Sequence, residues 1–517
     1  MNRQNSKGFW IGRWQPILIL GCLLVATLIV VACSSGSSST TSGMAAVKVT
    51  LTDPATCEAP TGPFSAVWVT ISDVQANISS TAGATDSGWV DLTPSLTQNK
   101  QAVQVNMLAL ANSGATQCLL AHLGDNMELQ AGNYQQIRLI LASSTSGLTL
   151  TSANNASTSV FATTDQCSST GAANCVQLAS DSSFHALQLS SEAQTGLKIP
   201  SGQIAGGGIS ISAGETKDLN IDFNTCASIV KEGNGMYRLK PVLTAGVVST
   251  TSTSMNGKVV DATGAAVAGA TVALEQPDGT KDSSGNPIDR IVLATVTASD
   301  GTWVICPVPA STYGNTYDVV IIGSNATGML SPTIVTGVSV GSTVGTIKLN
   351  AAAAALTSAA NTAGTLSGQV TSVNASSAGV VIDAALSVLE TFSGVDYTIP
   401  LPATGAQSSA DAALVTTAAY TNQSPACSPT SADCANYSIV VPASSAYIGA
   451  WSSGTITLTA PASALATYTV DGIATTDSST PTSDCTPPEK FTTATALTTT
   501  PLPPAAANLN LAFTGCN

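Results

Sequence analysis

The chain has 517 residues and a formal net charge of −14 at neutral pH, with 9% charged and 44% apolar residues. An acidic surface repels nucleic-acid phosphates, so no nucleic-acid partner is expected. The apolar fraction excludes a disordered chain. Abundant Ser, Thr, Ala, Gly and Val are typical of β-rich extracellular proteins. The length predicts about three or four domains.

The N-terminus has the layout of an export signal. An apolar run extends from Pro16 to Ala32, and three basic residues precede it: Arg3, Lys7 and Arg13. A positive segment followed by such a run is typical of a signal peptide, here residues 1–32. The alternative is an uncleaved membrane helix, for which the run is short.

The end of this run predicts a lipid anchor. Val30-Val31-Ala32-Cys33 resembles the bacterial lipobox, and the resemblance implies that Cys33 becomes the first mature residue, carrying diacylglycerol and palmitate. Several acyl chains hold a protein on a bilayer, since each buried CH₂ contributes about 0.8 kcal/mol. Ser34 stands where aspartate would favour inner-membrane retention in such lipoproteins, so we expect the outer membrane of the cell envelope. Residues 33–44 then form a flexible, lipidated tether.

Cysteine spacing predicts disulfides in the exported body, because an oxidising compartment allows them. The short polar segments SSTGAAN and SPTSAD lie between close cysteines, and a further pair brackets the last strands. The predicted pairs are Cys167 with Cys175, Cys427 with Cys434, and Cys485 with Cys516. For Cys57, Cys118, Cys226 and Cys306 the connectivity stays open: Cys306 bonds either Cys226 or Cys57, or two thiols stay free.

A zinc site competes with these disulfides. Neither close pair has the spacing of a zinc knuckle, and the chain has two histidines, His122 and His185. We therefore expect no metal and no other cofactor.

Period-two alternation predicts strands with one buried face at 47–52, 67–72 and 219–224, and a strand buried on both faces at 137–141. The one helical candidate is Val105–Leu120, where we expect at most a short helix.

Five blocks of the first half resemble a family. They are LTDP at Leu51–Pro54, FSAVWVTISDVQ at Phe64–Gln75, GWVDL at Gly88–Leu92, AGNYQQIRLIL at Ala131–Leu141, and the motifs between Asp222 and Leu243. In this order they resemble domain of unknown function 4382, which is common in bacterial lipoproteins. The resemblance implies a β-rich exported domain, residues 45–248, without established catalytic residues.

Asp53 and Asp222 lie beside strand ends within this first domain. Carboxylates in such places are compatible with Ca²⁺, which takes several oxygen ligands. Aspartate before proline is also a common turn opener, and we favour the turn.

A Ser/Thr linker precedes a second domain, residues 254–350. Its motifs NGKVVDATGAAVAGATVALEQPDG and TVTASDGTWVICPVPASTY resemble the carboxypeptidase regulatory-like, transthyretin-type domain, whose fold is carbohydrate-binding-like. The resemblance implies a β-sandwich with Trp303 in its core.

Residues 351–363 are predicted to be a linker. Beyond them, GTLSGQV and NYSIVVPASS echo MNGKVV and TWVICPVPAS of the second domain, so residues 364–517 are expected to be a degenerate repeat of the same sandwich. The predicted fold class is all-β, with three antiparallel β-sandwich domains in series behind an N-terminal lipoprotein signal peptide.

The motifs point to binding rather than catalysis. The chain contains no GxSxG, HExxH, GxxxxGK[ST] or CxxCH motif, so we expect no enzyme and name no catalytic residue, although a paired-carboxylate mechanism stays open. β-Sandwiches on a lipid anchor favour a surface scaffold or adhesion role, with the membrane and another envelope protein as partners.

The alternative is carbohydrate binding, with a polysaccharide as partner and Trp68, Trp89 and Trp451 as stacking candidates. Tryptophans gathered on one exposed surface would favour sugar binding, and scattered, buried ones would favour a scaffold. The ligand and the oligomeric state are not predicted.

Overall fold

A computed structural model describes most of the chain beyond residue 42. The described residues are 43–53, 64–83, 85–110, 121–152, 160–189, 196–205, 207–231, 236–239, 243–248, 254–310, 315–354, 356, 358–402, 412–419, 426–476, 485–500 and 502–516. The predicted signal peptide and Cys33 lie outside them. Met44–Asn517 form one compact unit, in which we name a first region (44–248), a second region (254–349) and a third region (359–516).

The described residues are nearly all β, as the composition and alternation predict. The first region contains β1 Met44–Thr52, β2 Phe64–Asn77, β3 Val90–Asp91, β4 Gln101–Asn106, β5 Ala121–Gln130, β6 Gly132–Tyr134, β7 Gln136–Leu141, β8 Thr149–Leu150, β9 Phe161–Ala162, β10 Cys175–Leu178, β11 Phe184–Leu189, β12 Leu197–Pro200, β13 Ile209–Ile211, β14 Thr216–Phe223, β15 Ile229–Lys231, β16 Tyr237–Leu239 and β17 Leu243–Val248. Its helices are short: α2 Pro94–Gln98, α3 Met107–Leu110, α5 Thr225–Ser228, and the 3₁₀ turns η1 Ser168–Thr170 and η2 Ser201–Gln203.

The strand positions predicted for this region are confirmed, but the single buried face is wrong for three of them. Thr50, Trp68, Thr70, Asn220 and Asp222, on the faces expected to be open, are buried as well, because other parts of the fold cover those faces. Strands β1, β2, β7 and β14 cover the four predicted segments, and β7 is buried on both faces as expected. Within Val105–Leu120 the described residues are the end of β4 and α3, a helix of 4 residues. The expectation of at most a short helix therefore holds where the segment is described.

The other two regions continue the β pattern. The second contains β18 Met255–Val260, β19 Thr271–Lys281, β20 Pro287–Val296, β21 Thr302–Ile305, β22 Pro309–Ala310, β23 Thr316–Ile322, β24 Ser324–Asn325, β25 Gly328–Met329, β26 Thr333–Ser339 and β27 Thr343–Lys348. The third contains the 3₁₀ turn η3 Ala359–Asn361 and β28 Ala363–Ser372, β29 Ile382–Phe392, β30 Val395–Thr398, β31 Ala413–Thr416, β32 Asp433–Pro442, β33 Tyr447–Ser452, β34 Thr455–Ile456, β35 Thr467–Thr476, β36 Glu489–Phe491, β37 Thr495–Ala496, β38 Ala505–Ala506 and β39 Leu511–Phe513.

The second and third regions share one pattern of contacts. β18 pairs antiparallel with β21 and parallel with β27, and β28 pairs in the same way with β32 and β39. Asp261 Oδ1 accepts the backbone N–H groups two and four residues ahead, and Asn374 Oδ1 does the same after β28. Tyr317 and Tyr468 each donate to a proline carbonyl, at 2.7 and 2.8 Å. The two regions therefore share this strand pattern, this turn and this tyrosine contact.

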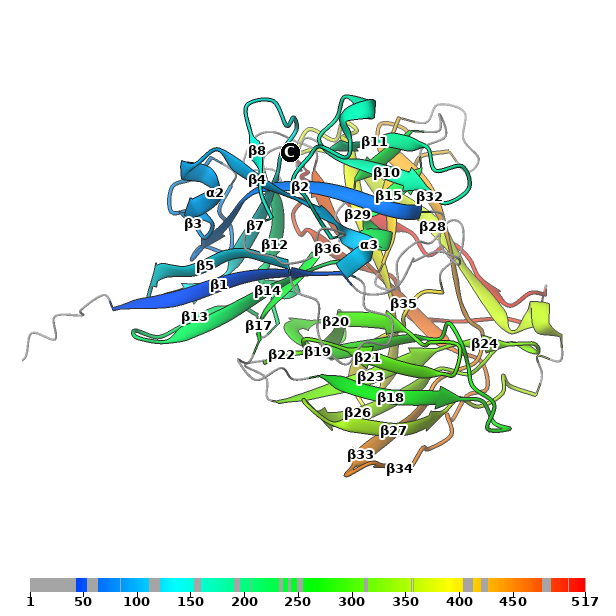
Figure 1. The fold of residues 1–517 in the computed structure, drawn as a ribbon. Coiled ribbons are helices and arrows are strands. Elements are labelled where there is room, and N and C mark those ends of the chain that lie inside the picture. The colour runs from blue at the N-terminus through cyan, green and yellow to red at the C-terminus, as the bar shows by residue number, and fades with distance from the viewer. Residues whose placement is uncertain are drawn as a thin grey trace, which may run out of the picture. The chain divides into compact units, whose positions relative to one another are not determined.

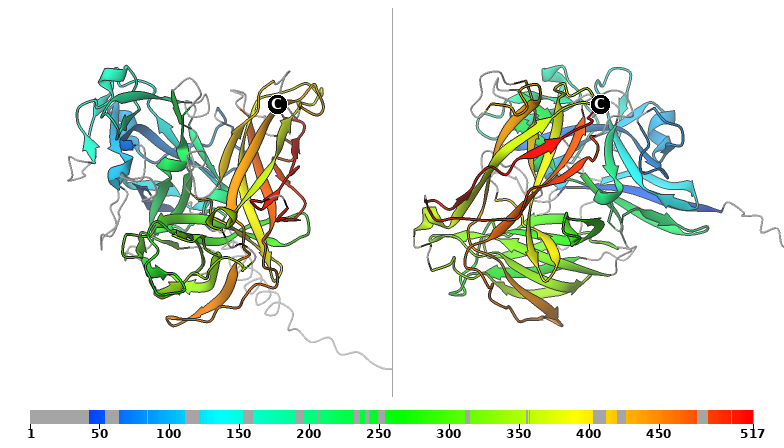
Figure 2. Two further views of the ribbon diagram at one scale, coloured as in Figure 1. Left: turned by 90° about the vertical axis from the view of Figure 1, so that its right-hand side faces the viewer. Right: turned by 180° about the vertical axis from the view of Figure 1, so that it is seen from behind.

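Each region has a hydrophobic core of its own, and the last two cores share a strand. In β23 the side chains of Val319 and Ile321 belong to the core of the second region, while Val320 and Ile322 belong to that of the third. Successive strand residues point to opposite faces, so β23 lies between the two cores. Figure 2 shows the yellow-to-red strands of the third region running alongside one another.

Shared sheets connect the three regions. β22 pairs with β17 of the first region, β20 pairs in parallel with β30, and β33 pairs in parallel with β26. Figure 1 shows β33 and β34, in orange, beside the green strands β26 and β27. These sheets mix parallel and antiparallel pairs, whereas the sequence predicts antiparallel sandwiches. Strands from different regions cover each other's edges, and an uncovered edge would be open to pairing with another chain.

Trp303 lies in the core of the second region, as the family resemblance implies, and is 3% exposed. Its ring lies against Gly257 on the neighbouring strand. A Cβ at Gly257 would stand 2.9 Å from the ring, so this close approach requires glycine.

Candidate functional site

A disulfide fastens one surface loop of the first region over a tryptophan. We call residues 163–174, between β9 and β10, the clamped loop. Cys167 and Cys175 are bonded, with their Cα atoms 5.5 Å apart, and both side chains are fully buried. Cys175 pairs with Trp68 on β2, and Trp68 packs with the two cysteines, 9% exposed. Trp68 therefore offers little of its ring to a sugar.

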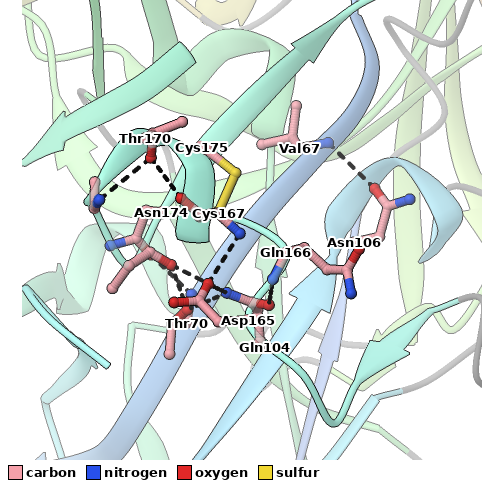
Figure 3. The surroundings of a disulfide bond; sticks show 12 residues. Val67, Thr70, Gln104, Asn106, Asp165, Gln166, Cys167, Thr170, Asn174 and Cys175 are labelled. Atoms are coloured by element: carbon pink, nitrogen blue, oxygen red, sulfur yellow. Dashed lines mark hydrogen bonds between the residues drawn. A yellow bond between two sulfur atoms is a disulfide. The ribbon is translucent and has the colours of Figure 1, made fainter. Parts of the chain in front are cut away.

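Two amide side chains and one carboxylate hold the clamped loop on the sheet (Figure 3). Asn174 Oδ1 accepts the backbone N–H of Thr70 at 2.8 Å, and Asn174 Nδ2 donates to the carbonyl of Ala142 at 2.8 Å. Gln104 Oε1 accepts the N–H of Gln166 at 2.9 Å. Asp165 Oδ1 accepts the N–H of Cys167 at 2.9 Å. Buried polar groups with partners fix a loop in one position, so this site is built for rigidity.

Two further disulfides join predicted pairs in the third region. They are Cys427–Cys434 and Cys485–Cys516. The second links the segment before β36 to the residues after β39, which ties down the C-terminal strands as expected.

The remaining cysteines were left open by the sequence. Cys306 is disulfide-bonded, so it is not a free thiol. Cys57, Cys118 and the side chain of Cys226 lie outside the described residues, and so does the partner of Cys306.

The other tryptophans lie apart from Trp68. Trp89 donates its Nε1–H to the carbonyl of Gly83 at 2.9 Å, and the guanidinium of Arg138 lies 4.1 Å from its ring centroid. A cation already stacks on this ring. Trp451, on β33, donates to the carbonyl of Val344 at 3.2 Å and packs against the second core. The three stacking candidates are thus scattered and at least partly covered.

His185 lies beside a serine and an aspartate, but not in the order of a catalytic triad. Ser183 Oγ lies 2.9 Å from His185 Nε2 and 2.6 Å from Asp181 Oδ1. Since the carboxylate accepts the serine hydroxyl, the proton that a base would take is directed away from the imidazole, whereas a catalytic triad orients the histidine with its acid. The exposed His122 lies on β5. This arrangement is that of a turn capped by Asp181.

Asp53 and Asp222 are brought together because β1 and β14 are parallel and end at the same edge. Asp53 Oδ1 accepts the N–H of Thr225 at 3.0 Å, and Asp222 Oδ1 accepts the hydroxyl of Thr52 at 2.9 Å. Burial raises the pKa of Asp53 well above its ordinary value, with a smaller contribution from the charge of Asp222. Within the described ranges, no group of three acids, histidines or cysteines has the arrangement of a metal site. The turn at Pro54 lies outside those ranges.

A buried ion cluster joins the second and third regions. We call Arg290 on β20 and its three carboxylate partners the charged joint. Arg290 Nε donates to Asp278 at 2.5 Å, Arg290 Nη1 donates to Asp471 at 2.7 Å, and Arg290 Nη2 donates to Glu489. Sequence reasoning missed this joint. The one local sign of it in the sequence is an arginine within a strand pattern, at Arg290. Two of the acids that pair with it, Asp471 and Glu489, lie far away along the chain.

The acids of the charged joint outnumber its cation. Burial would lower the pKa of Arg290, but the charges of Asp471, Asp278 and Glu489 raise it above its ordinary value. Burial raises the pKa of Asp471, against the opposing effect of Arg290. Burial, followed by the charge of Asp471, raises the pKa of Glu489 to about 7. One arginine thus compensates three buried acids only in part.

The crevice beside Arg290 is too small for an organic ligand. It lies between η2, β17, β19 and β20 and encloses about 20 Å³. A volume of this size holds about one water molecule.

Comparison with known families identifies the first region. Residues 44–241 contain a domain of unknown function (DUF4382), as the sequence blocks predict. A comparison with curated proteins gives no match. Among the described residues, no helix has the length and apolar character needed to cross a membrane.

Solved structures show only remote similarity. A leucine-rich repeat protein from Bacteroides thetaiotaomicron shares 11% identity over 52% of this chain and 27% of its own, with a TM-score of 0.19. The Bacillus anthracis TIE protein shares 9% identity over 91% of this chain and 50% of its own, with a TM-score of 0.13. A streptococcal ancillary pilin shares 9% identity over 80% of this chain and 96% of its own, with a TM-score of 0.15. The chain spans less than two thirds of the first two proteins, and no function is carried over from scores this low.

Proposed function

We propose that this chain is a non-enzymatic lipoprotein of the cell envelope, whose β-sandwich body acts as a surface scaffold with an adhesion or binding role. The observation that supports it most is the interlocking of the three regions. Strand pairs β17–β22, β20–β30 and β26–β33 cross the region boundaries, and the charged joint adds a buried ion cluster. A body held in this way keeps its binding surfaces in fixed relative positions.

The anchor is tested by acylation. Cys33→Ala is expected to abolish incorporation of radiolabelled palmitate and to release the protein from the membrane, since no other residue is proposed to carry lipid. Cys22→Ala, a matched substitution within the proposed signal, should leave labelling unchanged. Palmitate retained in Cys33→Ala would overturn the anchor. Ser34→Asp should move the protein to the inner membrane.

The scaffold is tested by cooperativity. Interlocked regions should unfold in urea in one transition when followed by tryptophan fluorescence and by far-ultraviolet circular dichroism. Separate transitions would show that the regions unfold independently of one another, which contradicts a rigid body.

Carbohydrate binding is tested by a glycan array with the full purified chain. The scattered and covered positions of Trp68, Trp89 and Trp451 lead us to expect no binding. Binding that Trp89→Ala abolishes would replace the scaffold proposal with a lectin-like role.

A further inference from the structure

Four segments of the first region meet at one end of its sheets, and none of them contains a charged residue. We call them the uncharged tip: residues 43–47, 76–82, 129–135 and 209–214. Met44 pairs with Gln130, and Gly132 pairs with Ile211. The backbone N–H of Gly214 donates to the carbonyl of Met44 at 2.9 Å. In Figure 1 this end lies at the left, where β1 and β13 run next to each other.

Two large apolar side chains of the uncharged tip are open to solvent. Met44 is 46% exposed and Ile78 is 61% exposed. Both lie beside one short segment, because Met44 pairs with Gln130 and a Cβ at Gly132 would stand 3.8 Å from Cγ2 of Ile78. Tyr134 fixes this segment, since its hydroxyl donates to the carbonyl of Gln130 at 2.9 Å. The tip therefore presents apolar side chains on a backbone that is held in place.

The charged residues that adjoin the tip do not enter it. Lys48, Glu128 and Glu215 come directly before or after its segments. Glu215 is paired with Lys217 at 2.6 Å, so its charge is compensated locally. Placing a charged side chain in lipid is costly. The tip can approach a bilayer without that cost, although the chain as a whole is acidic.

The other large apolar side chains that are exposed among the described residues lie elsewhere: Met236, Val381 and Leu502. Met236 precedes Tyr237, whose ring lies 5.7 Å from that of Phe64, the first residue of β2. Ile78 follows the last residue of β2, and a strand of 14 residues spans about 46 Å. Single exposed apolar residues are common on soluble proteins. Met236, at the opposite end of β2, is therefore the internal reference for Ile78.

The proposed tether joins the body at the uncharged tip. Ser34 to Gly43 separate the proposed lipidated Cys33 from Met44. A Ser-rich chain of about ten residues has a mean end-to-end distance of about 17 Å and a fully extended length of about 35 Å. Both lengths are shorter than β2. An anchor at Cys33 therefore keeps the tip close to lipid, and not the Met236 end of β2.

A short tether allows a weak contact to form. Joining two groups by a short flexible chain gives an effective concentration in the millimolar range. Burial of the exposed part of one isoleucine favours a contact by about fivefold, and Met44 adds an effect of the same kind. A contact too weak to hold a free protein on a bilayer is thus populated once the chain is anchored.

We propose that the uncharged tip rests on the bilayer to which the chain is anchored, with Met44 and Ile78 inserted at the lipid surface. This inference rests on the proposed lipid anchor and adds the surface of the body that meets the membrane. The contact gives the body one orientation, in which the Met236 end of β2 points away from the lipid.

Photolabelling of the full lipidated chain tests the contact. The chain is reconstituted into phosphatidylcholine vesicles that contain a diazirine phosphatidylcholine, floated on a density gradient, irradiated, and mapped by mass spectrometry. Labelling of 76–82 and 129–135 should exceed labelling of 236–239 by about fivefold or more. The N-terminal peptide reports the anchor alone, because its acyl chains hold it at the lipid in any orientation of the body.

Two matched variants separate the tip from the anchor. Ile78→Asp places a charge on the tip at an exposed position, so it should leave flotation unchanged and lower labelling of 129–135 by about fivefold. Met236→Asp makes the same change at the other end of β2 and should leave labelling of 129–135 as in wild type. Circular dichroism of both variants verifies that the fold is kept.

The remaining outcomes each contradict the proposal. A chain that floats with the vesicles but labels 76–82 no more than 236–239 keeps the anchor and overturns the contact. Equal losses in Ile78→Asp and Met236→Asp also overturn it. A chain that does not float contradicts the anchor and, with it, this inference. A dimer in detergent that Ile78→Asp dissociates would assign the tip to a second copy of the chain instead of lipid.

Discussion

The clamped loop and the charged joint both bury polar groups, but with different chemistry. The clamped loop is held by a disulfide and by the neutral side chains of Asn174 and Gln104. The charged joint buries Arg290 with three carboxylates, and its neighbours Asp289 and Asp318 add two more acids. Amide networks keep their hydrogen bonds over a wide pH range, whereas carboxyl networks change with each proton.

The difference matches where each network lies. The clamped loop lies within one region, where a fixed loop position is all that the contacts provide. The charged joint lies between two regions that have separate cores. The charged joint therefore places ionisable groups at a boundary, with partners that come from both regions.

The largest effect is expected from Arg290→Met, which keeps an apolar stem but removes the cation from the charged joint. Its partners Asp278 and Asp471 are 4% and 0% exposed at their side chains. Leaving buried carboxylates without their cation should lower the free energy of unfolding by about 3–5 kcal/mol. Urea unfolding at pH 7 measures this loss.

Arg138→Met is the matched control, because Arg138 contacts neutral Gln75 and the ring of Trp89 and feels the charge of a single named acid, Asp73, where Arg290 has three. It should cost clearly less than Arg290→Met. Equal losses would mean that the acids of the charged joint do not depend on their arginine.

The next effect concerns the clamped loop. Replacing Cys167 and Cys175 together with alanine releases a cross-link with a sequence separation of 8. Restoring that freedom to the unfolded chain should cost about 2.5 kcal/mol. The loss should be the same at pH 5 and pH 8, because no carboxylate or cation is removed. A loss that varies with pH would show that the disulfide is coupled to an ionisable group of the clamped loop, such as Asp165.

The smallest expected effect is a dependence of the free energy of unfolding on pH, which arises from Glu489 in the charged joint. The pKa of Glu489 is raised from 4.5 to about 7, so the folded state holds a proton that the unfolded state has lost between these values. Stability therefore falls as the pH rises from 4.5 to 7, by at most about 1 kcal/mol per pH unit for this partly exposed group. Glu489→Gln should reduce that slope in urea titrations at several pH values.

Glu215→Gln is the control for this slope. Glu215 is exposed, and its pKa is lowered by Lys217, so its contribution is lost below pH 4.5 and has the opposite sign. A decline between pH 4.5 and 7 that persists unchanged in Glu489→Gln would place the responsible proton elsewhere.

Local patterns were enough to predict much of this molecule. Alternation placed β1, β2, β7 and β14, because successive strand residues point to opposite faces and apolar side chains gather on one of them. Short polar segments between cysteines predicted the Cys167–Cys175 and Cys427–Cys434 bonds, because a bond across a small loop needs only local geometry. The family blocks predicted the domain at 44–241.

Contacts between distant strands were not predictable in the same way. Trp68 alternates with apolar neighbours, so its position on the sheet was clear, but only the fold shows that the clamped loop covers it. Arg290 and Asp471 are 181 residues apart, and no local pattern records such a pair.

The sequence by itself determined the all-β class, the strand positions and the short disulfides, since each depends on residues close together in the chain. The tertiary structure decided which strands cross between regions, which tryptophans are covered, and where the buried acids meet. Those features depend on strand order and on burial, because water is removed from around Arg290 and Asp471 only when strands far apart in the sequence come together, and it is this burial that shifts the pKa of Asp471.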